Sequence, residues 1–143
     1  MIRNIIDSQC EVKDETGPCF ASLTEQEKEL INNNKTEIEY SRGEIIAKQG
    51  TKANNILYLS EGLVKVGIRN GENYLILSIK PLKHFIATET LWGTDYHPYT
   101  ITALEDSVIH FIDTTVFKQV MKQNHNFSAK LMGVINTNVV TIY

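Results

Sequence analysis

Two apolar runs separated by Asn70-Gly71 constrain the fold of this chain more than any other feature. Residues 63–68 and 74–79 are rich in leucine, isoleucine and valine, and an Asn-Gly pair between such runs is a strong signal for a tight β-hairpin. Similar runs recur in five other places: residues 36–40, 45–47, 56–60, 99–103 and 107–112. Short strands at a spacing of about ten residues predict an all-β roll, barrel or sandwich.

Helical patterns flank this β region on both sides. Thr24 followed by Glu27 is typical of a capping box, which predicts a short helix over residues 24–33. Asp113 or Thr114 is suited to cap a second helix, and His125-Asn126 is expected to end it. We expect a last helix from residue 126 or 127 to residue 143.

The last helix carries an apolar seam. Its side chains recur at spacings of three, four and three residues: Met132, Ile135, Val139 and Ile142. This spacing is typical of a coiled coil of about two heptads and predicts a homodimer. The alternative is a helix that packs on its own β-roll. The pattern reaches Tyr143 without a polar cap or glycine, so we interpret the sequence as a fragment that stops within a helix.

The length and charge limit the classes of function. The 143 residues fit one domain, and the formal net charge is −3. A free-standing nucleic-acid-binding domain normally carries a basic face, whereas the lysines and arginines here are scattered. No apolar run has the length of a transmembrane helix, and the first residues do not form a secretory signal. We therefore expect a cytoplasmic protein with no membrane contact.

Several short motifs occur in an order and spacing that resemble those of a known family. They are Arg42-Gly43-Glu44, Gln49-Gly50, the stretch 58–66 and the stretch Ala103-Leu104-Glu105-Asp106-Ser107. Over residues 20–143 the chain resembles the effector domain of Crp/Fnr-type bacterial transcription regulators, and His97-Pro98-Tyr99 is more similar to the Fnr branch. The resemblance implies a mainly β fold with flanking helices: a cyclic-nucleotide-binding double-stranded β-roll (jelly roll), an N-terminal helix and a C-terminal dimerisation helix.

The resemblance also implies a domain organisation and a partner. Residues 1–20 would form an N-terminal arm, residues 21–124 the effector domain, and residues 125–143 the start of the dimerisation helix. In the family a winged helix-turn-helix follows, which this chain lacks, and the dimer binds a palindromic DNA site. The chain is then the sensory and dimerisation domain of a DNA-binding regulator. The alternative is a stand-alone or regulatory ligand-binding module that is not linked to DNA binding, as in a kinase or channel.

The expected ligand pocket departs from the family pattern. Nucleotide-binding members offer a Gly-Glu pair to the ribose and an Arg-Ser/Thr-Ala stretch to the cyclic phosphate. When residues 103–107 are aligned with the family, His97, Pro98 and Tyr99 occupy the phosphate positions. His97 lacks the permanent charge and planar fork of arginine, Pro98 has no N–H, and Tyr99 is large where a small residue lets the phosphate approach. Glu89 stands near the ribose position, but no glycine precedes it.

We therefore predict that the domain does not bind cyclic AMP or cyclic GMP. An unidentified small-molecule effector would use the same cavity, which we expect to be lined by Glu89, Trp92, His97, Pro98 and Tyr99. The alternative is that the aromatic side chains near it only fill the core.

Other site chemistries have weaker support. Cys10 and Cys19 are expected to be reduced thiols in the arm, with a redox role as the alternative. Two cysteines do not complete a tetrahedral metal site or the four-cysteine shell of an iron–sulfur cluster. His84 and His97 lack a carboxylate or cysteine at ligand spacing from both, and no nucleophile elbow or P-loop occurs. We expect no enzyme activity, no cofactor and no bound metal.

Overall fold

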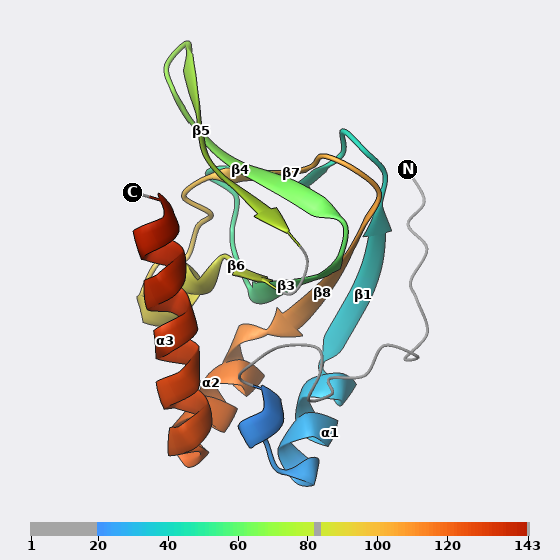
Figure 1. Cartoon of the computed structure of the whole chain (residues 1–143), viewed down its shortest axis with the longest axis vertical. Coiled ribbons are helices and arrows are strands. Elements are labelled where there is room, and N and C mark those ends of the chain that lie inside the picture. The colour runs from blue at the N-terminus through green and yellow to red at the C-terminus, as the bar shows by residue number, and fades with distance from the viewer. Residues whose placement is uncertain (1–19, 82–83, 143) are drawn as a thin grey trace.

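Two four-stranded antiparallel sheets form the body of the protein. The computed structural model describes residues 20–81 and 84–142, and for residues 20, 81, 92 and 134–142 it describes the backbone alone. The first sheet has the order β1 (Lys35–Tyr40), β8 (Ser107–Asp113), β3 (Asn55–Glu61) and β6 (His84–Ile86). The second has the order β2 (Ile45–Ala47), β7 (Thr100–Ala103), β4 (Leu63–Asn70) and β5 (Asn73–Pro81). The predicted β-roll is confirmed (Figure 1).

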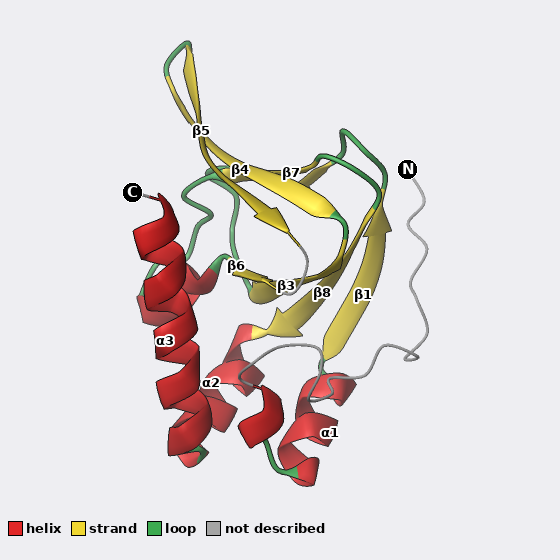
Figure 2. Cartoon of the chain, in the orientation of Figure 1, coloured by secondary structure: helices red, strands yellow, loops and turns green. Residues whose placement is uncertain are grey.

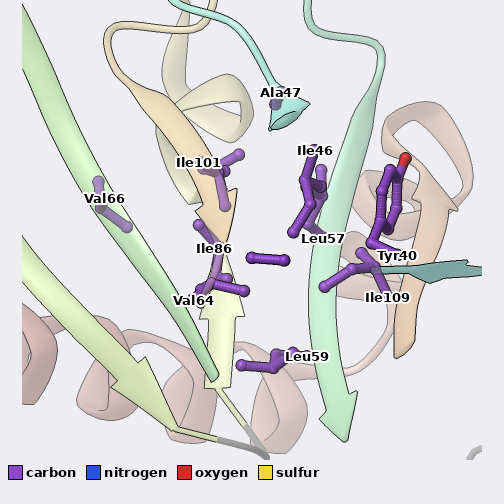
Figure 3. Close-up of a cluster of buried hydrophobic side chains, with 12 residues drawn as sticks. Tyr40, Ile46, Ala47, Leu57, Leu59, Val64, Val66, Ile86, Ile101 and Ile109 are labelled. Atoms are coloured by element: carbon purple, nitrogen blue, oxygen red, sulfur yellow. The ribbon is translucent and has the colours of Figure 1, made fainter. Parts of the chain in front are cut away.

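The interior of the roll is an apolar cluster between the two sheets. Alternate residues of each strand point inward, so Leu57, Leu59 and Ile109 of the first sheet pack with Val64 and Ile101 of the second. Figure 3 shows these side chains directed toward one another. Each is almost fully buried, and burial of one such side chain stabilises the fold by about 1.5–3 kcal/mol.

Helices cover the other face of the first sheet (Figure 2). They are the 3-10 turn η2 (Phe20–Ser22), α1 (Glu25–Asn33), α2 (Thr114–Gln123) and α3 (His125–Ile142). The side chains that join sheet and helices form a second buried cluster: Leu23, Ile31, Ile56, Tyr58, Phe85, Leu91, Ile112, Phe117, Val120, Phe127 and Leu131. Because Phe127 and Leu131 belong to it, the first half of α3 packs on its own domain.

Asn124 joins α2 to α3 and both to the N-terminal helix. Its side-chain oxygen accepts a hydrogen bond from the Phe127 N–H at 3.0 Å. Its side-chain nitrogen donates to the Ser22 carbonyl at 2.9 Å and to Glu27 Oε1 at 2.7 Å. Glu27 also closes the capping box of α1 with Thr24. The start of α3 is thus held by polar contacts as well as by the apolar cluster.

Most sequence predictions of elements agree with the structure. The helix over 24–33, its capping box, the Asn70-Gly71 hairpin and the Asp113 cap are confirmed. Several boundaries differ from the predicted ones by one or two residues. The break before the last helix is Asn124, which caps it, and α3 begins at His125. The strand expected from residue 99 begins at Thr100. Strand β6 and the 3-10 helix after it were not predicted.

Candidate functional site

The segment between β6 and β7 contains one residue with a strained backbone. It contains the 3-10 helix η3 (Thr88–Trp92), which Ala87 precedes with a left-handed backbone at φ 64°. Within the described ranges, Ala87 alone among non-glycine residues has a positive φ. This conformation costs an alanine free energy that glycine avoids. The Thr90 hydroxyl stabilises the turn by donating to the Ala87 carbonyl at 3.0 Å.

A hydrogen bond between Glu89 and Tyr99 joins the two ends of this segment. The Tyr99 hydroxyl lies 2.7 Å from Glu89 Oε1 and 2.6 Å from Glu89 Oε2, distances that are typical of a hydroxyl donating to a carboxylate. The same oxygen accepts from the Ala87 N–H at 3.3 Å. Burial, together with the nearby Glu89 charge, raises the pKa of Tyr99 far above its usual range, so the phenol stays protonated.

His97 is buried, with 8% of its surface exposed. Its backbone is tied to the turn after β2, since Gly50 N–H donates to the His97 carbonyl and His97 N–H to the Thr51 carbonyl, each at 2.8 Å. Its ring Nδ1 is buried without a hydrogen-bond partner. Burial lowers the pKa of His97, and Glu89 opposes this shift only in part, so the ring is neutral at neutral pH.

A pocket of about 250 Å³ opens beside His97 at the end of the roll. Its polar walls come from the segment that joins β2 to β3 and from the first residue of β3: Lys48, Thr51, Lys52, Asn54 and Asn55. Leu57 and Phe111 of the first sheet form part of its apolar wall. The unpartnered ring nitrogen of His97 thus belongs to a residue that lines a polar cavity.

Lys80 is a buried cation that the sequence analysis missed. It pairs with Val64 across the β4–β5 ladder, so it points into the roll with only 7% of its surface exposed. Burial lowers the pKa of Lys80, and the Glu89 carboxylate opposes that shift. The charge of Glu89 therefore affects the pKa of Lys80, of His97 and of Tyr99.

A β-bulge explains why Lys80 was missed. Val66 pairs with Ser78 while Gly67 pairs with Ile76, which leaves Leu77 as an extra residue. Strict alternation would place Lys80 on the same face as Ile76, facing solvent. The bulge reverses the faces of the residues that follow it, and the sequence carries no clear signal for it.

The structure brings only part of the predicted site together. Glu89 and Tyr99 are in contact, and His97 is buried near Glu89. Pro98, which lies between His97 and Tyr99 in the sequence, is half-buried. The side chain of Trp92 lies outside the described part of the chain, as do Cys10 and Cys19.

The predicted seam of the last helix is described at one position only. Met132 is 53% exposed, while the side chains of Ile135, Val139 and Ile142 lie outside the described residues. Among the described residues there is no group of three or more His, Cys, Asp and Glu side chains placed to hold a metal ion. None of the described helices is long and apolar enough to cross a membrane.

Comparison with known proteins identifies the family. Residues 37–124, more than half of the chain, match the model of the cyclic nucleotide-binding domain. No curated protein sequence matches the chain.

Solved structures with the same fold include sensor domains of regulators. The sensor domain of the transcriptional regulator DNR from Pseudomonas aeruginosa is 17% identical, with a TM-score of 0.75 over 84% of this chain and 86% of that one. A structure from Eubacterium rectale, assigned to the Crp/Fnr family of transcriptional regulators, is 18% identical, with a TM-score of 0.79 over 90% of this chain and 61% of that one.

The fold also occurs outside transcription regulators. The regulatory subunit of a cAMP-independent protein kinase A from Trypanosoma brucei, solved as a mutant bound to cAMP, is 15% identical. The TM-score is 0.68 over 80% of this chain and 42% of that one. This chain spans 57% of the length of the longer DNR structure. At these identities the likeness shows the fold alone.

Proposed function

We propose that this chain, which belongs to the cyclic nucleotide-binding domain family, is the sensory and dimerisation domain of a Crp/Fnr-type transcription regulator that does not respond to cyclic AMP. The role is ligand binding and signal transmission rather than catalysis. The contact between Glu89 and Tyr99 is the observation that carries the proposal.

His97 and the Glu89–Tyr99 contact both oppose nucleotide binding. A cyclic phosphate needs a permanent cation and several aimed donors, and at the position expected for that cation stands a buried His97 whose pKa is lowered by burial. The Tyr99 ring occupies the position of a small residue, and the carboxylate that holds it would repel an anionic phosphate. Binding would require breaking this hydrogen bond and displacing the ring.

Transmission to α3 has a structural route. Leu91 of η3 packs in the same buried cluster as Phe127 and Leu131 of α3. A ligand that binds one arrangement of this turn more tightly than another would shift the population of α3 positions. We propose that α3 pairs with a second copy through Met132, Ile135, Val139 and Ile142, and that a helix-turn-helix in the full-length protein contacts DNA.

The alternative is a regulatory module of another protein class. The kinase regulatory subunit from Trypanosoma brucei favours it, because that protein has the same fold and is named as cAMP-independent. The full reading frame discriminates between the two: a helix-turn-helix after α3 supports the regulator, and a kinase-associated or repeated cyclic-nucleotide domain supports the alternative.

Calorimetric titration tests the ligand claim. We expect cyclic AMP and cyclic GMP to give no binding heat with the wild-type chain at millimolar nucleotide. The Tyr99→Ala variant separates the obstacle of the Tyr99 ring from that of the missing cation, since it removes the ring and leaves His97 in place. Micromolar binding of either nucleotide to the wild type would contradict the proposal.

A further inference from the structure

A groove on the outer face of the second sheet gathers three cations. It has a volume of about 640 Å³ and is lined by Gly43, Ile45, Lys48, Lys65, Arg69, Tyr74, Thr100 and Thr102. No acidic residue is among these. Within residues 20–81 and 84–142, neither Lys48, Lys65 nor Arg69 forms an ion pair. The groove is thus a local positive site on a chain whose net charge is −3.

The strand register places these side chains together. Lys65 and Arg69 alternate with the buried Val64 and Val66 on β4, so they point away from the roll. Thr102 is paired with Lys65 and presents a hydroxyl on the same outer face. The groove is therefore formed on the four strands of the second sheet, and it shares Lys48 alone with the cavity beside His97.

Tyr74 forms part of the groove between two of the cations. The Lys65 ammonium lies 5.4 Å from the centre of its ring and the Arg69 guanidinium 5.5 Å, distances that suit cation–π contacts. The ring reaches this place because Gly67 has no side chain: a Cβ there would lie 2.2 Å from the Tyr74 hydroxyl oxygen. One aromatic ring thus holds both cations near each other.

Gln49 joins the turn that carries the third cation, Lys48, to the strand that carries the other two. Its side chain accepts a hydrogen bond from the Arg69 N–H at 2.8 Å and donates to the Arg69 carbonyl at 3.0 Å. The turn that carries Lys48 is therefore bonded to the strand that carries Lys65 and Arg69. A backbone that is fixed before binding loses less conformational entropy when a ligand arrives.

We propose that this groove binds the oligophosphate group of a small molecule, such as the triphosphate of a nucleotide. Arginine and lysine are the side chains that recognise phosphate oxygens, and the Thr102 hydroxyl adds a neutral donor. Three cations within one concave site match a short, highly charged group. A nucleic acid would need a basic surface that continues beyond the groove, which the net charge does not favour.

Titration with sodium tripolyphosphate and with ATP tests the proposal. We expect one saturable site per chain. Replacing Lys65 and Arg69 together by glutamine should weaken it about a hundredfold, since each charged hydrogen-bond partner contributes roughly tenfold. The matched control is Lys118→Gln with Lys122→Gln, which removes the same charge from exposed positions of α2 and should leave the affinity unchanged.

Three outcomes would overturn the proposal. One is absence of tripolyphosphate binding to the folded wild type. The second is an equal loss of affinity in the groove variant and the α2 control, because the binding would then depend on net charge alone. The third is a single-stranded oligonucleotide or a glutamate-rich peptide that binds the same groove at least about tenfold more tightly than ATP, which would assign the site to a macromolecule. Circular dichroism of each variant verifies folding.

Discussion

The Tyr99 hydroxyl lies 2.6 and 2.7 Å from the two carboxylate oxygens of Glu89, across the segment that joins β6 to β7. The residues are ten positions apart in the sequence, one on a 3-10 helix and the other just before β7. The contact therefore ties together the two ends of the segment that would have to open for a ligand. Its strength determines how readily this segment moves.

Tyr99→Phe is expected to lower the free energy of unfolding by about 1–2 kcal/mol. The variant loses a hydrogen bond to a charged acceptor and leaves the Ala87 N–H without its partner. Urea unfolding measures the change. Tyr96→Phe is the matched control, since Tyr96 is 58% exposed and its hydroxyl should contribute less than about 0.5 kcal/mol. Equal effects of the two substitutions would contradict the importance of the contact.

A variant in which the phosphate-binding and ribose-binding positions are changed to the family residues is expected to bind cyclic AMP. The sequence alignment put Glu89 near the ribose position. Because Ala87 has the left-handed backbone that favours glycine, we propose that the next residue, Thr88, takes the glutamate position of the family pair instead. The variant combines Thr88→Glu, Glu89→Gln, His97→Arg, Pro98→Thr and Tyr99→Ala. It restores the permanent cation, the N–H donor and the space for the phosphate.

Calorimetry of this variant should detect micromolar cyclic AMP. The control carries the other four substitutions and keeps His97, and it should bind at least about tenfold more weakly, because the charged pair with the phosphate is absent. A folded variant that binds no nucleotide would show that other walls of the pocket also exclude it.

The roll could be predicted because its signals are local. Thr24 and Glu27 are three residues apart and meet within one helical turn, and the Asn70-Gly71 pair lies between the two strands it connects. Strand β6 has only three residues, too few for alternation alone to identify it; β2 is equally short, but the Arg42-Gly43-Glu44 turn motif precedes it. Elements defined by short-range patterns were therefore found, and an element stabilised by its neighbours in the sheet was not.

The sequence selected residue types for the candidate site, but it did not predict their contacts. Alignment pointed to Glu89, His97 and Tyr99 as departures from the family pattern, and their burial and bonding depend on how the turn folds back on β7. Lys80 faces the interior only because a bulge precedes it. Neither relationship has a signature in the spacing of residues, since both arise from long-range packing.

Acid is expected to destabilise the protein through His110. Burial, with the nearby Lys35 charge, lowers the pKa of His110 to about 4, whereas the unfolded value is about 6.5. Between these values the unfolded chain binds a proton that the folded chain does not, so stability falls as the pH drops from about 6.5 to about 4. The loss is on the order of 2 kcal/mol.

Urea unfolding at about pH 7 and at about pH 4.5 measures this dependence. Each pH lies about half a unit above one of the two pKa values, about 6.5 unfolded and about 4 folded. His110→Gln should reduce the acid-induced loss. His125→Gln removes a histidine that is exposed on α3 and should leave the loss unchanged. An unaltered pH profile in His110→Gln would assign the acid sensitivity to other groups.

Asn124→Ala is expected to loosen the joint between α2 and α3. The substitution removes the cap of α3 and the bonds to Ser22 and Glu27, at a cost of about 2 kcal/mol. Asn126→Ala changes the same residue type at an exposed position and should cost less than about 0.5 kcal/mol. Hydrogen exchange should be faster in the first turn of α3 for the first variant only; equal exchange rates would contradict the role of Asn124.

Met132→Glu is expected to convert a dimer into a monomer. Met132 is 53% exposed on α3, and a carboxylate at an apolar helix–helix seam would be desolvated without a partner. Lys130→Glu provides the control, because residue 130 is exposed and lies about 200° around the helix from residue 132. Sedimentation velocity should give a dimer for the wild type and Lys130→Glu and a monomer for Met132→Glu. A wild-type monomer at high concentration would contradict pairing through this seam.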